Sequence, residues 1–167
     1  MMVRARFLSC TRGAAAAEMA LILPLATLLL FTTLEAGHWM YTQHQVVKGL
    51  RDGARYAARQ SIDDVDCAGI SATVISEVQN LSTTGQLVNG GSPRVSGWDP
   101  SEVEVLVNCT RVDATVAQAG IYDSSEPGRS VIVRTRFDYD SLFNGLGILS
   151  DTTVDLNGEQ EAAWMGI

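Results

Sequence analysis

The hydrophobic and polar residues of this chain follow three patterns in succession. Residues 19–34 form an apolar run of 16 residues without a charge, preceded by the small residues Ala14–Ala17 and by Glu18. Residues 46–58 then repeat apolar positions at helical spacing, with charged residues between them. Beyond residue 100, apolar and polar residues alternate, which is the period of a half-buried strand. The chain therefore predicts a long helix followed by a small α+β domain.

The long helix is expected over residues 14–60. Alanine and leucine dominate its first half and both favour helix, while Pro24 removes one backbone hydrogen bond and is expected to kink it. Residues 14–36 together reach the roughly 20 residues that cross a bilayer, so they predict a transmembrane part. The apolar face of the second half is formed by Val46, Val47, Leu50, Ala54, Ala57 and Ala58.

The distal domain, residues 61–167, is predicted to hold a second helix and an antiparallel sheet. The helix is expected over Cys67–Leu81, because apolar residues recur there at helical spacing. The stretch Ser82–Pro100 is rich in Gly, Ser, Thr and Pro, which is typical of a loop. Three strands are expected, over residues 102–109, 130–139 and 152–163, and the third has the weakest alternation.

Charge is divided unevenly between the two ends of the chain. Before Gly13 the charged residues are all arginines, whereas from Ser61 onward 16 Asp and Glu face five Lys and Arg, a net charge of −11. The leading arginines place the N-terminus in the cytoplasm by the positive-inside rule. Four cations beyond the span work against that orientation: Lys48, Arg51, Arg55 and Arg59. The acidic excess is typical of a solvated surface and argues against nucleic-acid binding.

Three cysteines are present, Cys10 near the N-terminus and Cys67 and Cys109 in the distal domain. An exported domain with two cysteines favours one disulfide, which would tie the second helix to the first strand. Two buried free thiols are the alternative. No metal or other cofactor is expected, since two cysteines and two distant histidines lack the spacing of a zinc site.

The order of segments at the N-terminus differs from that of a secretory signal. In a signal peptide the small-residue cleavage site follows the apolar stretch, whereas here Gly13 and the alanines precede it. A carboxylate inside an apolar helix is usually paired or functional, so Glu18 is a candidate assembly contact. The alternative is an interfacial Glu18 that reaches the headgroups. Glu35, near the outer end of the span, is expected to be an exposed interfacial carboxylate.

Several motif pieces recur in one order along residues 12–58. They are Gly13, Glu18, Pro24, Glu35, Gly37, Tyr41 and the run Arg51-Asp52-Gly53-Ala54-Arg55-Tyr56-Ala57-Ala58. This succession resembles the TadE-like pseudopilins of tight-adherence (Tad/Flp) pilus systems. Two residues depart from the family pattern, since Met19 stands where Phe is usual and His38 where Arg is common.

The resemblance implies a precursor that a membrane prepilin peptidase cuts between Gly13 and Ala14, removing the basic leader 1–13. The mature chain would be a minor pilin or pseudopilin anchored in the bacterial inner membrane. Its distal domain would be periplasmic or extracellular, its partners would be other pilins or pseudopilins, and Glu18 would pair with the free amine of a neighbour's Ala14.

Other functions fit the sequence less well. An enzyme is not expected, because the chain has no nucleophile motif, phosphate-binding loop or paired-carboxylate signature. An unprocessed single-pass membrane protein with a binding or scaffold domain stays open. A secreted domain cut near Ala36 is a further alternative, although Leu34 stands where a signal peptidase requires a small residue. The mature N-terminus separates these possibilities.

Overall fold

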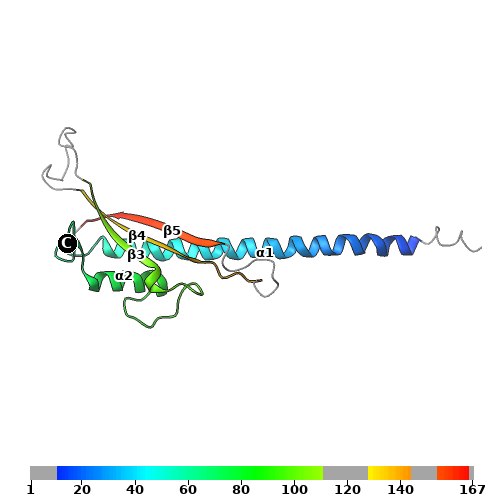
Figure 1. Cartoon of the computed structure of the whole chain (residues 1–167), viewed down its shortest axis with the longest axis horizontal. Coiled ribbons are helices and arrows are strands. Elements are labelled where there is room, and N and C mark those ends of the chain that lie inside the picture. Colours follow the sequence, from blue (N-terminus) through cyan, green and yellow to red (C-terminus); the bar gives the residue numbers. More distant parts are fainter. Residues whose placement is uncertain (1–10, 111–127, 144–153, 166–167) are drawn as a thin grey trace, which may run out of the picture. The chain divides into compact units, whose positions relative to one another are not determined.

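The computed structural model describes residues 11–110, 128–143 and 154–165 (Figure 1). The elements, in chain order, are α1 (Thr11–Ala57), β1 (Val65–Asp66), β2 (Gly69–Ile70), α2 (Ala72–Thr84), the 3-10 helix η1 (Pro100–Glu102), β3 (Val103–Thr110), β4 (Gly128–Asp138) and β5 (Asp155–Ala163). By its internal contacts the chain divides into two units, Met1–His38 (unit 1) and Trp39–Ile167 (unit 2). The fold is α+β, as the sequence predicts.

Unit 1 is helical wherever it is described. Helix α1 begins at Thr11 and continues through Pro24 without interruption. The predicted leader 1–13 lies largely outside the described residues, which include only its last three positions.

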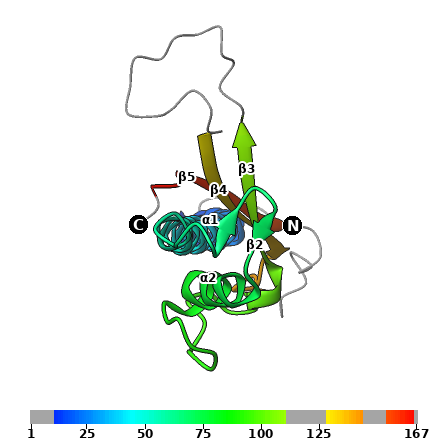
Figure 2. The same ribbon diagram turned by 90° about the vertical axis from the view of Figure 1, so that its left-hand side faces the viewer.

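Unit 2 folds around one apolar core, to which α1, α2 and the inner face of the sheet contribute (Figure 2). The predicted apolar face of α1 is buried at Val46, Leu50, Ala54 and Ala57, and Val47 is half-buried. Trp98 enters this core from the loop after α2, where its ring stacks on Phe137 with the centroids 5.6 Å apart. The other main core residues are Val65, Val74, Val78, Val95, Val103, Val131, Val133, Tyr139 and Leu156.

The sheet has three antiparallel strands in the order β3-β4-β5. The three predicted strands are present, with bounds that differ by one or two residues, since Glu102 lies in η1, Tyr139 follows β4 and Val154 precedes β5. Positions 152 and 153 of the third lie outside the described residues. On the outward face, Glu104, Arg134 and Glu159 form one row across the three strands. Arg134 donates a hydrogen bond from Nε to Glu104 Oε2 at 2.8 Å, which lowers the pKa of the Glu104 carboxyl.

The predicted start of the second helix at Cys67 is wrong. Residues 65–70 instead form the short antiparallel hairpin β1-β2, and α2 begins at Ala72. The reason is local, because Ser71 caps the helix by accepting a hydrogen bond from the Val74 backbone N–H. The helix also runs past Leu81 to Thr84 and ends at Gly85, whose φ of 81° is in the left-handed region that glycine tolerates.

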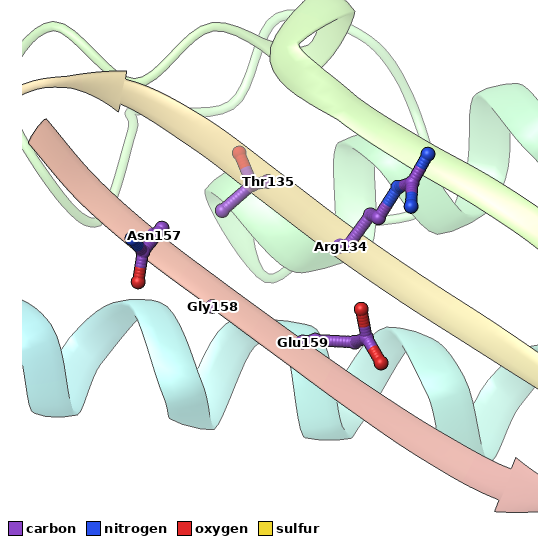
Figure 3. A pocket seen from close by; sticks show the side chains of 5 residues that line it. All are labelled: Arg134, Thr135, Asn157, Gly158 and Glu159. Carbon is purple, nitrogen blue, oxygen red and sulfur yellow. The ribbon is translucent and has the colours of Figure 1, made fainter.

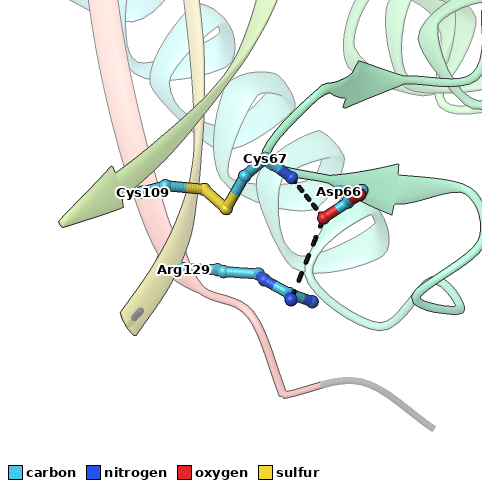
Figure 4. Close-up of a disulfide and its surroundings, with 4 residues drawn as sticks. All are labelled: Asp66, Cys67, Cys109 and Arg129. Atoms are coloured by element: carbon cyan, nitrogen blue, oxygen red, sulfur yellow. Dashed lines mark hydrogen bonds and ion pairs between the residues drawn. A yellow bond between two sulfur atoms is a disulfide. The ribbon is translucent and has the colours of Figure 1, made fainter. Parts of the chain in front are cut away.

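The predicted disulfide is present, and it joins Cys67 to Cys109 with their Cα atoms 5.9 Å apart (Figure 4). Cys67 lies in the turn of the hairpin, so the bond ties the hairpin, and not a helix, to β3. Asp66 accepts a hydrogen bond from the Cys67 backbone N–H at 2.6 Å and pairs with Arg129 at 3.8 Å. The Arg129 guanidinium lies over the ring of Trp164, 5.1 Å from its centroid. These contacts hold the hairpin against the end of the sheet.

Removing the disulfide with Cys67→Ala/Cys109→Ala is expected to destabilise unit 2 by roughly 2–4 kcal/mol, because the bond closes a long loop in the unfolded chain. The residues it joins are 42 positions apart. The measurement is urea unfolding of the full chain in detergent. The control Cys10→Ala leaves the bond in place, and an equal unfolding midpoint for the two variants would contradict the expectation.

Candidate functional site

The unit 1 part of α1 presents apolar side chains along its length. Nine large ones are exposed by half or more: Met19, Leu21, Ile22, Leu23, Leu25, Leu28, Leu29, Leu30 and Leu34. The polar side chains among them are satisfied within the helix, since Thr27 Oγ1 donates to the Leu23 carbonyl at 2.7 Å and Thr33 Oγ1 donates to that of Leu30 at 2.8 Å. A segment that spans the hydrocarbon core of a membrane needs internal hydrogen bonds of this kind, because water cannot supply partners there.

By length and composition, one helix in the described part of the chain, within Ala15–Ala57, is able to cross a membrane. Large contiguous exposed apolar patches mark membrane or protein contacts in native proteins. The exposed surface of unit 1 is therefore a candidate anchoring and assembly surface.

The predicted processing and assembly residues lie near the start of α1. Gly13 and Ala14 are in its first turns, and a side chain added at Gly13 would meet open space. Glu18 is exposed, and no partner for its carboxylate occurs among the described residues. Cleavage after Gly13 and pairing of Glu18 remain predictions.

Glu35 is not the exposed carboxylate that its position predicted. The residue is 9% exposed, and neither carboxylate oxygen has a hydrogen-bond partner in the part of the chain that the structure describes. A buried carboxylate without a partner is unfavourable when charged. The helical pattern of α1 alone does not reveal this burial.

The Arg51–Ala58 motif, together with Gly49 one turn earlier, forms the surface of α1 on which α2 packs, here called the seat. A Cβ at Gly53 would clash with Ser82 Oγ and lie 3.2 Å from Cγ1 of Val78. One turn earlier, a Cβ at Gly49 would clash with the Ser82 carbonyl oxygen and lie 2.9 Å from the Trp98 ring. The two glycines therefore allow the backbones of α1 and α2 to approach closely.

Two polar side chains of the same motif fix the segments around this seat. Asp52 pairs with Arg94 at 3.0 Å, which holds the loop after α2 against α1. Tyr56 donates its hydroxyl to Glu77 Oε2 at 2.7 Å. This hydrogen bond, together with burial, raises the pKa of the Tyr56 phenol. The motif thus organises unit 2, whereas the Gly13–Glu18 segment belongs to unit 1.

A shallow hollow of about 290 Å³ lies over β4 and β5 (Figure 3). Its lining residues are Arg134, Thr135, Asn157, Gly158 and Glu159. The arginine is bonded to Glu104, and the set contains no nucleophile beside a general base. Among the described residues, no group of three or more His, Cys, Asp or Glu side chains is placed to hold a metal ion. The hollow therefore provides no basis for a catalytic proposal.

A helix that by length and composition is able to cross a membrane, followed by a disulfide-linked α+β unit, is the layout of a membrane-anchored protein over the described residues. Within that class the chain carries a TadE-like segment, since residues 13–55 match the family model described as TadE-like protein. The resemblance drawn from the motifs is confirmed over these residues, from the glycine before the small-residue run to Arg55. No curated protein and no solved structure matches the chain.

Sequence reasoning missed the helix–helix seat and the position of Trp98. The spacing of Gly49 and Gly53, four residues apart on one helix face, is the signal that predicts a close helix crossing. Gly158 gives no such signal, although a Cβ there would lie 2.8 Å from Cδ1 of Leu50 and push β5 away from α1.

Proposed function

We propose that this chain is a minor pilin or pseudopilin, a membrane-anchored structural component of tight-adherence (Tad/Flp) pilus assembly. The observation that carries the proposal is the TadE-like match over residues 13–55, which contains both Gly13 and the exposed apolar part of α1. The match also includes Gly49, Asp52 and Gly53, which build the seat of unit 2. The matched residues therefore connect an anchor with the base of a folded unit, which is what a structural subunit requires.

In this proposal a prepilin peptidase cuts between Gly13 and Ala14, and the mature chain stays in the inner membrane through α1. The positive-inside rule favours a cytoplasmic N-terminus, and the disulfide favours an oxidising compartment outside the cytoplasm for unit 2. Other pilins or pseudopilins of the same system are the partners, and Glu18 is the charged contact between neighbouring helices.

The Gly13→Leu variant tests the processing step. Glycine lets a protease approach the backbone closely, and a branched side chain at that position obstructs the approach. We expect the variant to stay at precursor mass in cells that carry a tight-adherence system, whereas the wild-type chain loses its leader. The matched variant Ala17→Leu adds a similar side chain beyond the cut and should be processed. Normal processing of Gly13→Leu would remove the basis for a prepilin-type precursor.

A further inference from the structure

Four basic side chains form one exposed stripe along the unit 2 part of α1 and the turn that follows it. Lys48, Arg51, Arg55 and Arg59, the basic stripe, are all exposed and follow one another at spacings of three and four residues. Such spacing places Lys48, Arg51 and Arg55 on one face of α1, where at 1.5 Å per residue they span about 10 Å. Arg59 lies in the turn just after the helix ends at Ala57. At 100° per residue this face lies opposite the buried face around Leu50.

Among the residues that the structure describes, the basic stripe has no counter-charge. None of its side chains forms an ion pair with any residue in the described ranges. The acidic residue of this stretch, Asp52, is already bound to Arg94 at 3.0 Å. Like charges four residues apart on a helix repel one another, so the stripe is unfavourable in the isolated chain. An acidic partner surface would relieve that repulsion.

On the outward face of the sheet, β5 supplies two acidic positions of matching spacing, beside Arg134, whose guanidinium is bonded to Glu104. Glu159 and Glu161 on β5 are both exposed, and they point to the same face because they are two residues apart. Two strand positions span about 7 Å, and four helix positions, as from Arg51 to Arg55, span about 6 Å. The two carboxylates, here called the acidic row, can therefore face two cations of the stripe in register.

We propose that the basic stripe of one copy docks on the acidic row of a second copy of this chain. The stripe and the row are different surfaces and both face away from the core, so one copy can use both at once. A contact between two different surfaces is heterologous, and it repeats from copy to copy into a ring when the rotation closes or an open assembly when it does not. Both surfaces belong to unit 2, so this contact is separate from the proposed transmembrane contact at Glu18.

Photo-cross-linking of the full chain in its membrane tests this contact. The cross-linker replaces His44, an exposed residue one turn before Lys48 on the stripe face. We expect cross-linked homodimers whose second site maps to β5. Arg51→Gln/Arg55→Gln should lower their yield by about tenfold, because charge complementarity sets register and encounter at such interfaces. The matched control Thr73→Glu/Ser76→Glu lowers the net charge by the same amount on the exposed side of α2 and should leave the yield unchanged.

Charge reversal makes the test specific. The variants Arg51→Glu/Arg55→Glu and Glu159→Arg/Glu161→Arg should each lose homodimers, and their co-expression should restore cross-links between the two variants. Cross-links to a different protein or to lipid without homodimers, or no restoration on co-expression, would overturn the proposal. Membrane insertion and removal of the leader are scored in the same cells. A failure of the pilin role therefore appears separately from a failure of this contact.

Discussion

Replacing Gly49 by alanine will destabilise unit 2 by about 2 kcal/mol, through overpacking of a close contact. The sign of this stability change is informative, because alanine is the better helix former by roughly 1 kcal/mol and should otherwise stabilise α1. The added methyl group would meet the Ser82 carbonyl oxygen and the Trp98 ring. The first is backbone, and the second is held in the core with its Nε1–H donating to Thr135 Oγ1 at 3.0 Å. Urea unfolding of the full chain in detergent, followed by tryptophan fluorescence, measures the loss.

Two glycines of the same helix provide graded controls. Gly37 has open space around an added Cβ, so Gly37→Ala should be neutral or slightly stabilising. At Gly53 the nearest atom is the Ser82 hydroxyl, which can rotate, so Gly53→Ala should fall between the other two. If Gly49→Ala unfolds at the same urea concentration as Gly37→Ala, α2 does not pack on α1 through this seat.

The Glu18→Ala variant will insert into the membrane normally but fail to enter the assembly. An unpaired carboxylate at the centre of a bilayer costs roughly 2.5–3.5 kcal/mol on translocon scales and less near the interface. Pairing with the free amine of a neighbour's Ala14 would offset part of that cost and fix the register between subunits. Helices in lipid associate through close packing and polar contacts, so losing the charged contact removes much of the specificity.

Membrane fractionation combined with in-cell cross-linking along residues 14–41 measures both parts of this expectation. Glu35→Ala is the matched variant, since it removes a carboxylate from the same helix and should have a milder effect. Glu18→Ala chains that cross-link to their partners and form filaments at wild-type levels would show that Glu18 is only a tolerated interfacial charge.

The sequence predicted those elements whose hydrophobic period is long and regular. The helix through Val46, Leu50 and Ala54 and the strand through Val131 and Val133 were found because each buries one face. The true start of the second helix, after Cys67, was missed because two-residue strands are too short to show a hydrophobic period. The cap at Ser71, three residues before the N–H that it binds, marks the true helix start.

The predicted sites likewise separate into those that the sequence reveals and those that depend on the fold. Cysteine count and compartment predicted the pair Cys67 and Cys109, because two cysteines allow one pairing in an exported domain. The role of Gly49 could not be read from periodicity, since it depends on which residue of α2 arrives opposite, here Ser82. The burial of Glu35 could not be predicted either, since the pattern along the helix predicts an exposed residue there.

The identity of the mature N-terminus distinguishes a prepilin-type subunit from the alternatives. The chain is isolated from membranes of cells that carry a tight-adherence system, and its mass and first residues are determined. A prepilin-type subunit is expected to begin at Ala14 and to retain the apolar part of α1. A chain that retains Met1, or one that begins near Gly37 without the apolar helix, would contradict the assignment as a prepilin-type subunit.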